Sequence, residues 1–313
     1  MVRRGAALKT AEVIERATQD FSSLHGHCFD LLNVSRPVSP AAALNLAKII
    51  SKLSPLLGNL IEFNIVEFLN DQKHFQGLGR WKRQDPGFPD AIFEGCVSPT
   101  PGFEIKAWFP LATEITARFK DSQTHFVGDN THVALIAWLP RHLIYGEPYI
   151  LDICVVSGAS VAASRDQHYH NPPDYLVMEP EDTTARTKNL QQTNTNGFKF
   201  QGTSTELRAA KAIVQSWGKD GAKHSTSASY QALLRTELMN RFTYRLDTNF
   251  AKIDRIVHPG IETFKRKVRS MELHGHTISQ WAKILASHDD EMVCKKLKKH
   301  LGITDSDTNA IVS

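Results

Sequence analysis

The chain has 313 residues, of which 41% are hydrophobic, a formal net charge of +4, and four cysteines without a CxxC pair. This composition is ordinary for a globular protein and excludes a disulfide framework and a zinc ribbon. No apolar run approaches the roughly 20 residues that a membrane span needs, and the start lacks the apolar block of a signal peptide. We therefore expect a cytoplasmic protein with no membrane partner.

The front of the chain is predicted to be helical. Apolar residues from about Ala6 to Val34 follow helical spacing, and Ser39 with Pro40 provides an N-cap and a first turn for a second helix. Pro55 predicts a restart, with a third helix after it. Glu62 falls in the middle of the apolar stripe of that third helix.

Short β-like runs follow a stretch rich in Gly, Arg and Pro at 77–90, which we expect to form a loop. The predicted strands are 91–97, 102–109, 114–120, 132–140 and 149–157. The last two are nearly continuous apolar runs, as is typical of central strands that are covered on both faces.

The remainder mixes loops, one further strand and helices. Residues 165–175 are predicted to form a loop, 175–180 a strand, 204–218 a helix, 218–229 a polar loop, and the chain from about Tyr230 helices. Asn196 and Gly197, set between alternating residues, predict the turn of a β-hairpin. The fold class is therefore α/β, a mixed central β-sheet flanked by helices, with helical N- and C-terminal additions. We divide it into residues 1–54, 55–184, 185–250 and 251–313, within one compact unit.

Two opposite charges interrupt the predicted strand 102–109. Glu104 and Lys106 are two residues apart, so both side chains leave the same face of the strand, and Asp90 ends the preceding stretch. Carboxylates are the ligands that a hard divalent cation such as Mg²⁺ prefers. A neighbouring lysine can orient or deprotonate a water. The combination favours phosphodiester hydrolysis.

Pro89-Asp90 followed by Glu104-Ile105-Lys106 resembles the signature of the PD-(D/E)xK nuclease superfamily. Gly58 and Glu62 resemble the glycine and helix glutamate of its MutH-like branch, and the likeness covers about Pro55 to Val156. The resemblance implies a type II restriction endonuclease in which Asp90, Glu104 and Glu62 hold Mg²⁺ and Lys106 completes the catalytic set. The interval from Asp90 to Glu104 is longer than in that branch, which implies an extended hairpin.

Each of these residues also has a simpler interpretation. Glu62 could be an exposed helix carboxylate, and Asp90 could end a turn. Glu104 and Lys106 could form a solvated pair on an edge strand. His132, His168 and His170 are interpreted as polar residues rather than metal ligands. No Gly-rich phosphate loop is present, so no nucleotide cofactor is expected.

The segment Ala185–Arg245 holds ten Lys/Arg against three Asp/Glu, so one region of the chain is electropositive. Amide side chains can pair with adenine, and a two-stranded ribbon fits the major groove. The predicted base-contacting residues are Gln191, Gln192, Asn194, Asn196 and Lys199. The predicted phosphate-contacting residues are Arg186, Lys188, Lys219 and Lys223. A polar surface hairpin is the alternative.

The sequence therefore predicts a magnesium-dependent, sequence-specific endonuclease of double-stranded DNA. Cutting both strands requires two active sites, so a homodimer is expected. Three alternatives stay open: a monomeric nicking or repair endonuclease, a non-catalytic DNA-binding protein, and a metabolic α/β enzyme.

Overall fold

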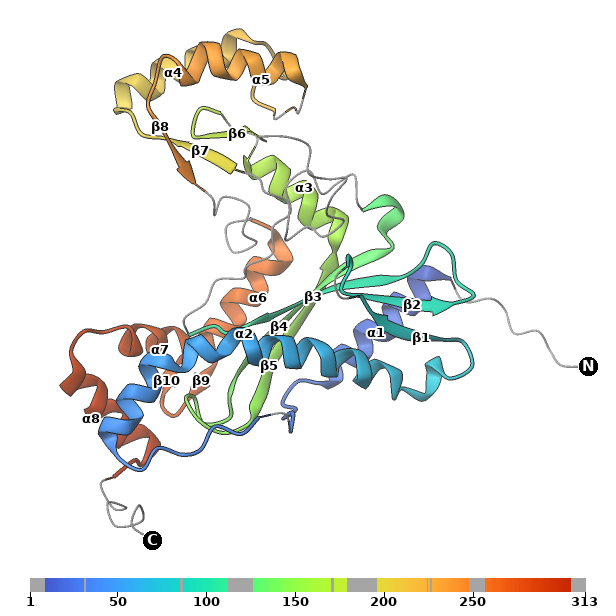
Figure 1. Cartoon of the computed structure of the whole chain (residues 1–313), viewed down its shortest axis with the longest axis vertical. Helices are drawn as coiled ribbons and strands as arrows, with labels where there is room; N and C mark the ends of the chain where they lie inside the picture. Colours follow the sequence, from blue (N-terminus) through green and yellow to red (C-terminus); the bar gives the residue numbers. More distant parts are fainter. Residues whose placement is uncertain are drawn as a thin grey trace, which may run out of the picture.

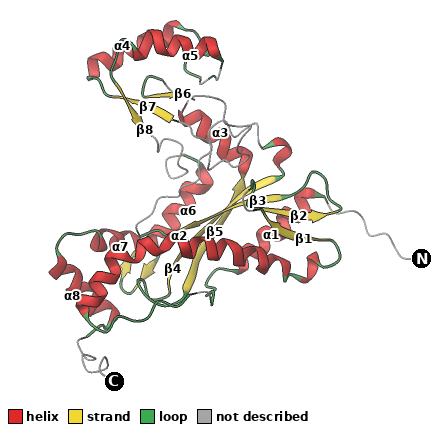
Figure 2. Cartoon of the chain, viewed as in Figure 1, coloured by secondary structure: helices red, strands yellow, loops and turns green. Residues whose placement is uncertain are grey.

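The computed structural model describes residues 9–30, 32–84, 87–111, 126–169, 172–178, 196–223, 225, 227–247 and 257–304. A five-stranded sheet lies in the middle of the larger body, with helices on both sides (Figures 1 and 2). Its strands are β1 (Gly79–Arg83), β2 (Ala91–Gly95), β3 (Gly102–Trp108), β4 (Thr131–Pro140) and β5 (Pro148–Ser157), in that spatial order. The predicted α/β class with a mixed sheet is confirmed.

Only the pair β3 and β4 is parallel; the other neighbours in this sheet run antiparallel. β4 is buried along almost its whole length, as its apolar run predicts. β5, which we also predicted to be central, is instead an edge strand. Helices α1 (Thr10–Ser23) and α6 (Pro259–Ser270) pack on it, and its residues are buried at Ile150 and Leu151 but only half-buried from Asp152 to Ser157.

The prediction of a loop at 77–90 is wrong for β1. Trp81 is buried between the exposed Arg80 and Lys82, the alternation of an amphipathic strand. The outer edge of β1 is closed at this residue by Asn70, whose side chain accepts from the Trp81 N–H at 2.8 Å and donates to its carbonyl at 3.0 Å. The Gly- and Pro-rich composition around Trp81 is typical of a loop, which is why the sequence pattern did not predict β1.

Helix α2 (Pro40–Asn70) lies along the front of the sheet in Figure 1 and contacts β1 and β3. Ser39 caps it as predicted, by accepting from the Ala42 N–H. The predicted break at Pro55 is wrong, and the helix continues through it. Proline removes the donor to the carbonyl of residue 51, and the Ser54 hydroxyl takes its place by donating to the Ser51 carbonyl at 2.7 Å.

The C-terminal region is mostly helical, as predicted. Its helices are α6, α7 (Ile278–Leu285) and α8 (Asp290–Leu301), and α8 packs on α2. A short hairpin of β9 (Glu272–Leu273) and β10 (His276–Thr277), which the sequence did not predict, lies between α6 and α7. Side chains from these helices share one apolar core with the five-stranded sheet and with α1 and α2.

A second sheet forms from β6 (Tyr175–Met178), β7 (Asn196–Phe200) and β8 (Tyr244–Asp247), with β7 in the centre. Helices α4 (Ser204–Ser216) and α5 (Ala228–Leu234), which a π-helical turn (Arg235–Met239) extends, supply a separate apolar cluster. We call residues 172–247 of this group, as far as they are described, the small module; it stands at the top of Figure 1. β6 belongs to it, although we grouped that strand with 55–184.

Helix α3 (Gly158–Tyr169) follows β5 directly and contacts β6, so it joins the larger body to the small module. The prediction of a loop from residue 165 is therefore wrong up to Tyr169. The predicted turn at Asn196 and Gly197 is also wrong, because Gly197 pairs with Val177 on one side and Asp247 on the other. A residue paired on both sides lies inside a sheet. The predicted strand 114–120 lies outside the described residues.

Among the helices of the described part of the chain, α2 alone is long and apolar enough to cross a membrane by length and composition. It is instead laid along the sheet, with buried residues at Ala43, Ala47, Ile50, Leu57 and Ile61. This spacing of three and four places a single side of the helix against the core.

Candidate active site

The four residues predicted to form the site meet on the side of the sheet that faces α2. Asp90 immediately precedes β2, and Glu104 and Lys106 lie two apart on β3, which is next to β2. Phe103, on the opposite face of β3, packs on Phe21 of α1 with ring centroids 5.0 Å apart. Strand alternation thus sends the apolar side chain to one face and the charges to the other.

Lys106 is the centre of this cluster. Its ammonium nitrogen lies 2.7 Å from Oδ2 of Asp90 and 3.0 Å from Oε1 of Glu104. The same Asp90 oxygen accepts from the backbone N–H of Ile105 at 2.8 Å. The Glu104 side chain is 1% exposed and that of Asp90 is 22% exposed. The cluster is therefore closed at Glu104 and open to solvent at Asp90.

Glu62 reaches the cluster from α2, where it accepts the backbone N–H of Ala107 at 3.1 Å. Gly58 lies one turn earlier on the same helix, and a Cβ at this position would lie 3.4 Å from the Cβ of Ala107. The helix therefore runs at contact distance from β3. The absence of a side chain at Gly58 brings Glu62 close enough to bond to that strand.

The surroundings of Glu62 and Glu104 raise the pKa of both side chains above that of a free glutamate. Burial raises the pKa of Glu62 to about 7, although Lys106 opposes the shift. Burial likewise raises the pKa of Glu104 to about 7, again against Lys106. For Lys106 burial alone lowers the pKa, but Glu104, Asp90 and Glu62 together hold it above the usual value for lysine. The ammonium stays charged, and the acids are held in an environment short of positive charge.

Two of the simpler interpretations do not describe these residues. β3 lies between β2 and β4, so Glu104 and Lys106 are not on an edge strand and are buried rather than solvated. Glu62 bonds to β3 and is not an exposed helix carboxylate. Charged groups are rarely buried at such cost without a functional reason, so the cluster is a candidate active site.

Two residues that the sequence did not single out support the site. Gln84, at the end of β1, donates its backbone N–H to the Asp90 carbonyl at 2.7 Å and its side-chain amide to the Pro89 carbonyl at 3.0 Å. Arg83 lowers the pKa of Glu62 slightly and lies over the ring of Phe63. The alternation of charged and apolar residues around Trp81 was the available signal, because it predicts a strand that ends beside Asp90.

The donor set fits a hard divalent cation in its chemistry. Oxygens of Asp90 and Glu104 converge on one cationic atom, the Lys106 nitrogen, and carboxylate oxygen is the preferred ligand of Mg²⁺. Within the described ranges, no group of three or more His, Cys, Asp or Glu residues is arranged to hold a metal. The Lys106 ammonium stands where the two carboxylates meet, so a metal ion would have to displace it.

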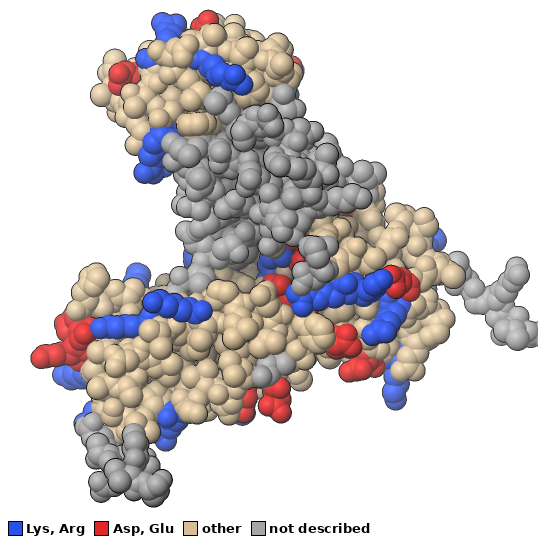
Figure 3. Space-filling model, in the orientation of Figure 1, with Lys and Arg blue, Asp and Glu red and all other residues tan. Residues whose placement is uncertain are grey.

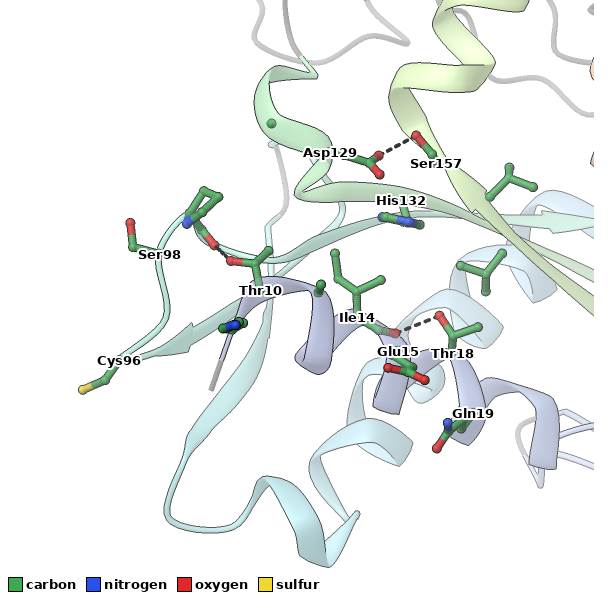
Figure 4. A pocket seen from close by; sticks show the side chains of 16 residues that line it. Thr10, Ile14, Glu15, Thr18, Gln19, Cys96, Ser98, Asp129, His132 and Ser157 are labelled. Carbon is green, nitrogen blue, oxygen red and sulfur yellow. Dashed lines mark hydrogen bonds between the residues drawn. The ribbon is translucent and has the colours of Figure 1, made fainter. Parts of the chain in front are cut away.

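A cavity of about 890 Å³ lies on the other side of the sheet, between α1, the loop at 96–99, and the adjoining ends of β4 and β5 (Figure 4). None of the four clustered residues lines it. His132 of β4 lines the cavity, and burial lowers the pKa of its imidazole. Asp129 and Ser157 also line it, and the Ser157 hydroxyl donates a hydrogen bond to the Asp129 carboxylate. Among the described residues that line this cavity, His132 is the one histidine. We therefore keep the cluster around Lys106 as the candidate active site.

The residues predicted to contact DNA are only partly described. Gln191, Gln192, Asn194, Arg186 and Lys188 lie outside the described residues, as does His170. Asn196 is the first residue of β7 and pairs with Met178. Lys219 is exposed after α4, and Lys223 bonds to Asp220 at 2.7 Å.

Lys199 lies in the middle of β7, directly opposite Arg245 of β8. Both are exposed, and the flanking Phe198 and Phe200 face the apolar cluster of the small module. Figure 3 shows basic side chains at the end of this module where β8 lies. Both side chains are cationic at neutral pH, so this strand pair presents positive charge on the exposed face. Arg245 was counted in the basic segment but was not singled out from the sequence.

Comparison with known proteins gave no match: no family model, no curated protein and no solved structure is significantly similar to this chain.

Proposed function

We propose that this protein is a divalent-metal-dependent endonuclease that cuts double-stranded DNA at specific sequences. The observation that carries the proposal is the convergence around Lys106 of Asp90 and Glu104, from the antiparallel pair β2–β3, and Glu62, from α2. The resemblance to the PD-(D/E)xK superfamily implies a hairpin of this kind in a mixed sheet, which supports the same function.

Asp90, Glu104 and Glu62 would hold Mg²⁺, which supplies charge neutralisation at the phosphate and a more acidic water. Lys106, once separated from the carboxylates, would hold the attacking water through its ammonium group. Asp90 would be a rigid ligand, because its backbone and side chain are held by hydrogen bonds from Gln84 and from the Ile105 N–H. Glu62 adds negative charge from α2.

The small module would bind the DNA backbone. Lys199 and Arg245 lie opposite each other on its exposed sheet face, and exposed lysine and arginine side chains are common phosphate contacts. Several such contacts make the affinity fall steeply with salt.

Plasmid digestion with Mg²⁺ tests the proposal. The protein should give discrete fragments, and Lys106→Ala should reduce cleavage by at least about a thousandfold while DNA binding persists. Glu62→Gln, which keeps the shape of the side chain, provides a second variant if Lys106→Ala folds poorly. Lys82→Ala, whose lysine pairs with Glu94 on the surface, is the matched control.

The product separates the alternatives. A monomeric nicking enzyme would give open circles, and a DNA-binding protein without catalysis would shift DNA in calcium and magnesium alike and leave it intact. A metabolic enzyme would show no salt-sensitive DNA affinity. Normal cleavage by both variants would show that the site is assigned incorrectly.

A further inference from the structure

A group of histidines in the C-terminal region takes no part in the candidate active site. His274 and His276 belong to the hairpin of β9 and β10, His142 to the turn between β4 and β5, and His300 to the last turn of α8. The imidazole ring centroids of His276 and His300 lie 4.5 Å apart, and those of His142 and His274 lie 6.3 Å apart. We call these four residues the histidine cluster. It joins the hairpin to two segments that are distant along the chain (Figure 1).

The hairpin is packed closely against α7 and α8. Gly275 has a positive φ of 77°, and a Cβ at this position would lie 3.2 Å from Nδ1 of His300. Trp281 of α7 donates its indole N–H to the Leu273 carbonyl at 2.7 Å. Its ring meets the rings of His276 and His300 edge-on, with centroids 5.1 Å and 5.7 Å away. These contacts hold the two imidazole rings close together.

The contact between Lys296 of α8 and His276 requires a neutral imidazole. Nζ of Lys296 lies 3.4 Å from Nε2 of His276. An ammonium group has donors and no acceptor, so Nε2 of His276 must accept, which only an unprotonated ring nitrogen can do. A proton on this nitrogen would therefore remove the hydrogen bond and bring two cations into contact.

The other charges around His276 also oppose a proton on its ring. Partial burial lowers the pKa of His276, and the charges of Lys296, His300 and Lys299 lower it further. A hydrogen bond with Gln280 of α7 acts in the opposite direction. The neutral ring is therefore the form that the surroundings of His276 favour.

The second pair of rings lies in a similar setting. Partial burial lowers the pKa of His274, and the charges of His142 and His300 lower it further. Glu272, the acidic residue of the hairpin, is exposed. Among the described residues, no Asp or Glu contributes to the pKa shift of His274 or His276. Protons bound here would add positive charge that no described carboxylate offsets.

His300 also lacks a counter-charge. Its Nε2 is buried and has no hydrogen-bond partner among the described residues. The end of a helix favours a cation, but Arg36 already takes that place by donating to the Gly302 carbonyl at 2.8 Å. A proton on Nε2 of His300 would be a buried donor without an acceptor, which is costly.

We propose that the histidine cluster makes the C-terminal region sensitive to acid: below about pH 6, protons bound by His276 and His300 force the hairpin and the end of α8 apart. The neutral rings pack against Trp281, whereas two imidazolium rings beside Lys296 repel each other at short range. α8 packs on α2, the helix that carries Glu62, so the loosened segment borders the support of the active-site cluster. A protein without nuclease activity would respond to acid in the same way.

Amide hydrogen exchange at pH 7 and pH 5, corrected for the intrinsic pH dependence of exchange, tests the proposal. Protection of the hairpin and of the last turns of α8 should fall about tenfold at pH 5, while protection in β4 should not fall. His276→Gln should remove most of this loss, because the Gln side-chain oxygen still accepts from Lys296 but binds no proton. An undiminished loss in that variant would overturn the proposal, as would a wild type that keeps its protection at pH 5 or loses it equally in β4.

His74→Gln is the matched control. Nε2 of His74 lies 3.0 Å from the carboxylate of Asp20, so a proton on this ring faces an anion rather than a cation. The variant should therefore show the wild-type loss of protection in the hairpin. If His74→Gln abolished the loss as well as His276→Gln does, the response would not belong to the histidine cluster.

Lys296→Met provides a second test if His276→Gln folds poorly. It removes the cation that faces His276 and keeps an apolar side chain of similar length. The pH midpoint of the His276 Cε1 proton signal, measured by NMR, should then move to higher pH by at least about 0.5. A contact that serves packing alone would leave the midpoint in place, so an unmoved midpoint would also overturn the proposal.

Discussion

The two sheets of this protein hold their charged residues in opposite ways. In the five-stranded sheet Glu104 and Lys106 are buried on a strand paired on both sides, and hydrogen bonds fix Asp90 and Glu62 beside them. In the three-stranded sheet Lys199 and Arg245 are exposed and lie opposite each other. The first arrangement holds charges at fixed distances, as catalysis requires; the second leaves cations accessible to a large anionic partner.

Their energetic consequences differ because the surroundings differ. Removing one member of a buried charge cluster leaves its partners without compensation, whereas an exposed cation is solvated with or without a neighbour. Changes in the larger body should therefore alter both stability and activity. Changes on the exposed face of the small module should alter DNA binding alone.

The largest effect is expected from Lys106→Met. Asp90 and Glu104 lose their buried cation, which should lower the free energy of unfolding by about 3–5 kcal/mol near pH 8. The loss should be smaller near pH 5.5, because Glu104 then takes up a proton. Urea unfolding of the wild type and the variant at both pH values measures this loss in the free energy of unfolding. Lys82→Met, which breaks the exposed pair with Glu94, should cost at most about 1 kcal/mol; equal losses for both lysines would contradict the comparison.

Leu238→Ala should have the next largest effect, confined to the small module. Leu238 is fully buried in the cluster with Leu176, Ala210, Val214 and Leu234. The truncation should destabilise this cluster by about 2–4 kcal/mol. Amide hydrogen exchange should then speed up in α4 and stay unchanged in β4, since the two elements belong to different apolar clusters. Equal acceleration in both would show that the two regions unfold together.

The pH dependence of stability should distinguish the buried acids. The folded protein holds the pKa of Glu62 and Glu104 at about 7, above the ordinary value of 4.5 for a free glutamate. Between these values the folded state binds more protons than the unfolded chain, so the free energy of unfolding should fall as pH rises from about 4.5 to about 7. Glu62→Gln should remove part of that decrease, on the order of 2 kcal/mol.

Magnesium should counteract the same decrease. An ion bound by the carboxylates replaces the protons, so Mg²⁺ should raise the melting temperature near pH 8 and have little effect near pH 5.5. Thermal scans with and without Mg²⁺ at the two pH values measure this. An identical shift at both would mean that the ion binds away from Glu62 and Glu104.

Arg245→Ala should have the smallest effect on stability, within about 0.5 kcal/mol, because its side chain is exposed. DNA affinity should fall, and the slope of log affinity against log salt should decrease by about 1, as expected when one phosphate contact is lost. Fluorescence anisotropy across a salt series measures both. Lys82→Ala on β1 is the control; a matching loss there would indicate nonspecific attraction by net charge.

The sequence predicted the parts of the fold that depend on local patterns. The Ser39 cap, the helix at 204–218 and the strands β2, β3 and β4 follow from capping residues and from periods of two and 3.6 residues. The same reasoning named Glu62, Asp90, Glu104 and Lys106, since two charges on one strand face and a glutamate in an apolar helix stripe are visible in the residue order.

The failures have a common origin in contacts between residues distant along the chain. Pro55 stays inside α2 because that helix is packed along the sheet and Ser54 bonds to the freed carbonyl. Gly197 lies within a sheet because β6 and β8 pair on either side of it. A proline or an Asn-Gly pair favours a helix break or a turn only weakly, and tertiary packing that buries a large apolar surface overrides this preference.

What the sequence determined by itself is the composition of the candidate site: which acids, which lysine and on which faces of their elements they lie. Only the tertiary structure decided that β3 is flanked on both sides, that Lys106 stands between Asp90 and Glu104, and that Leu56 of α2 stays exposed. Residue order fixes the direction of a side chain within its own element. Burial, pKa and partnership arise from the elements packed around it, which distant segments of the chain supply.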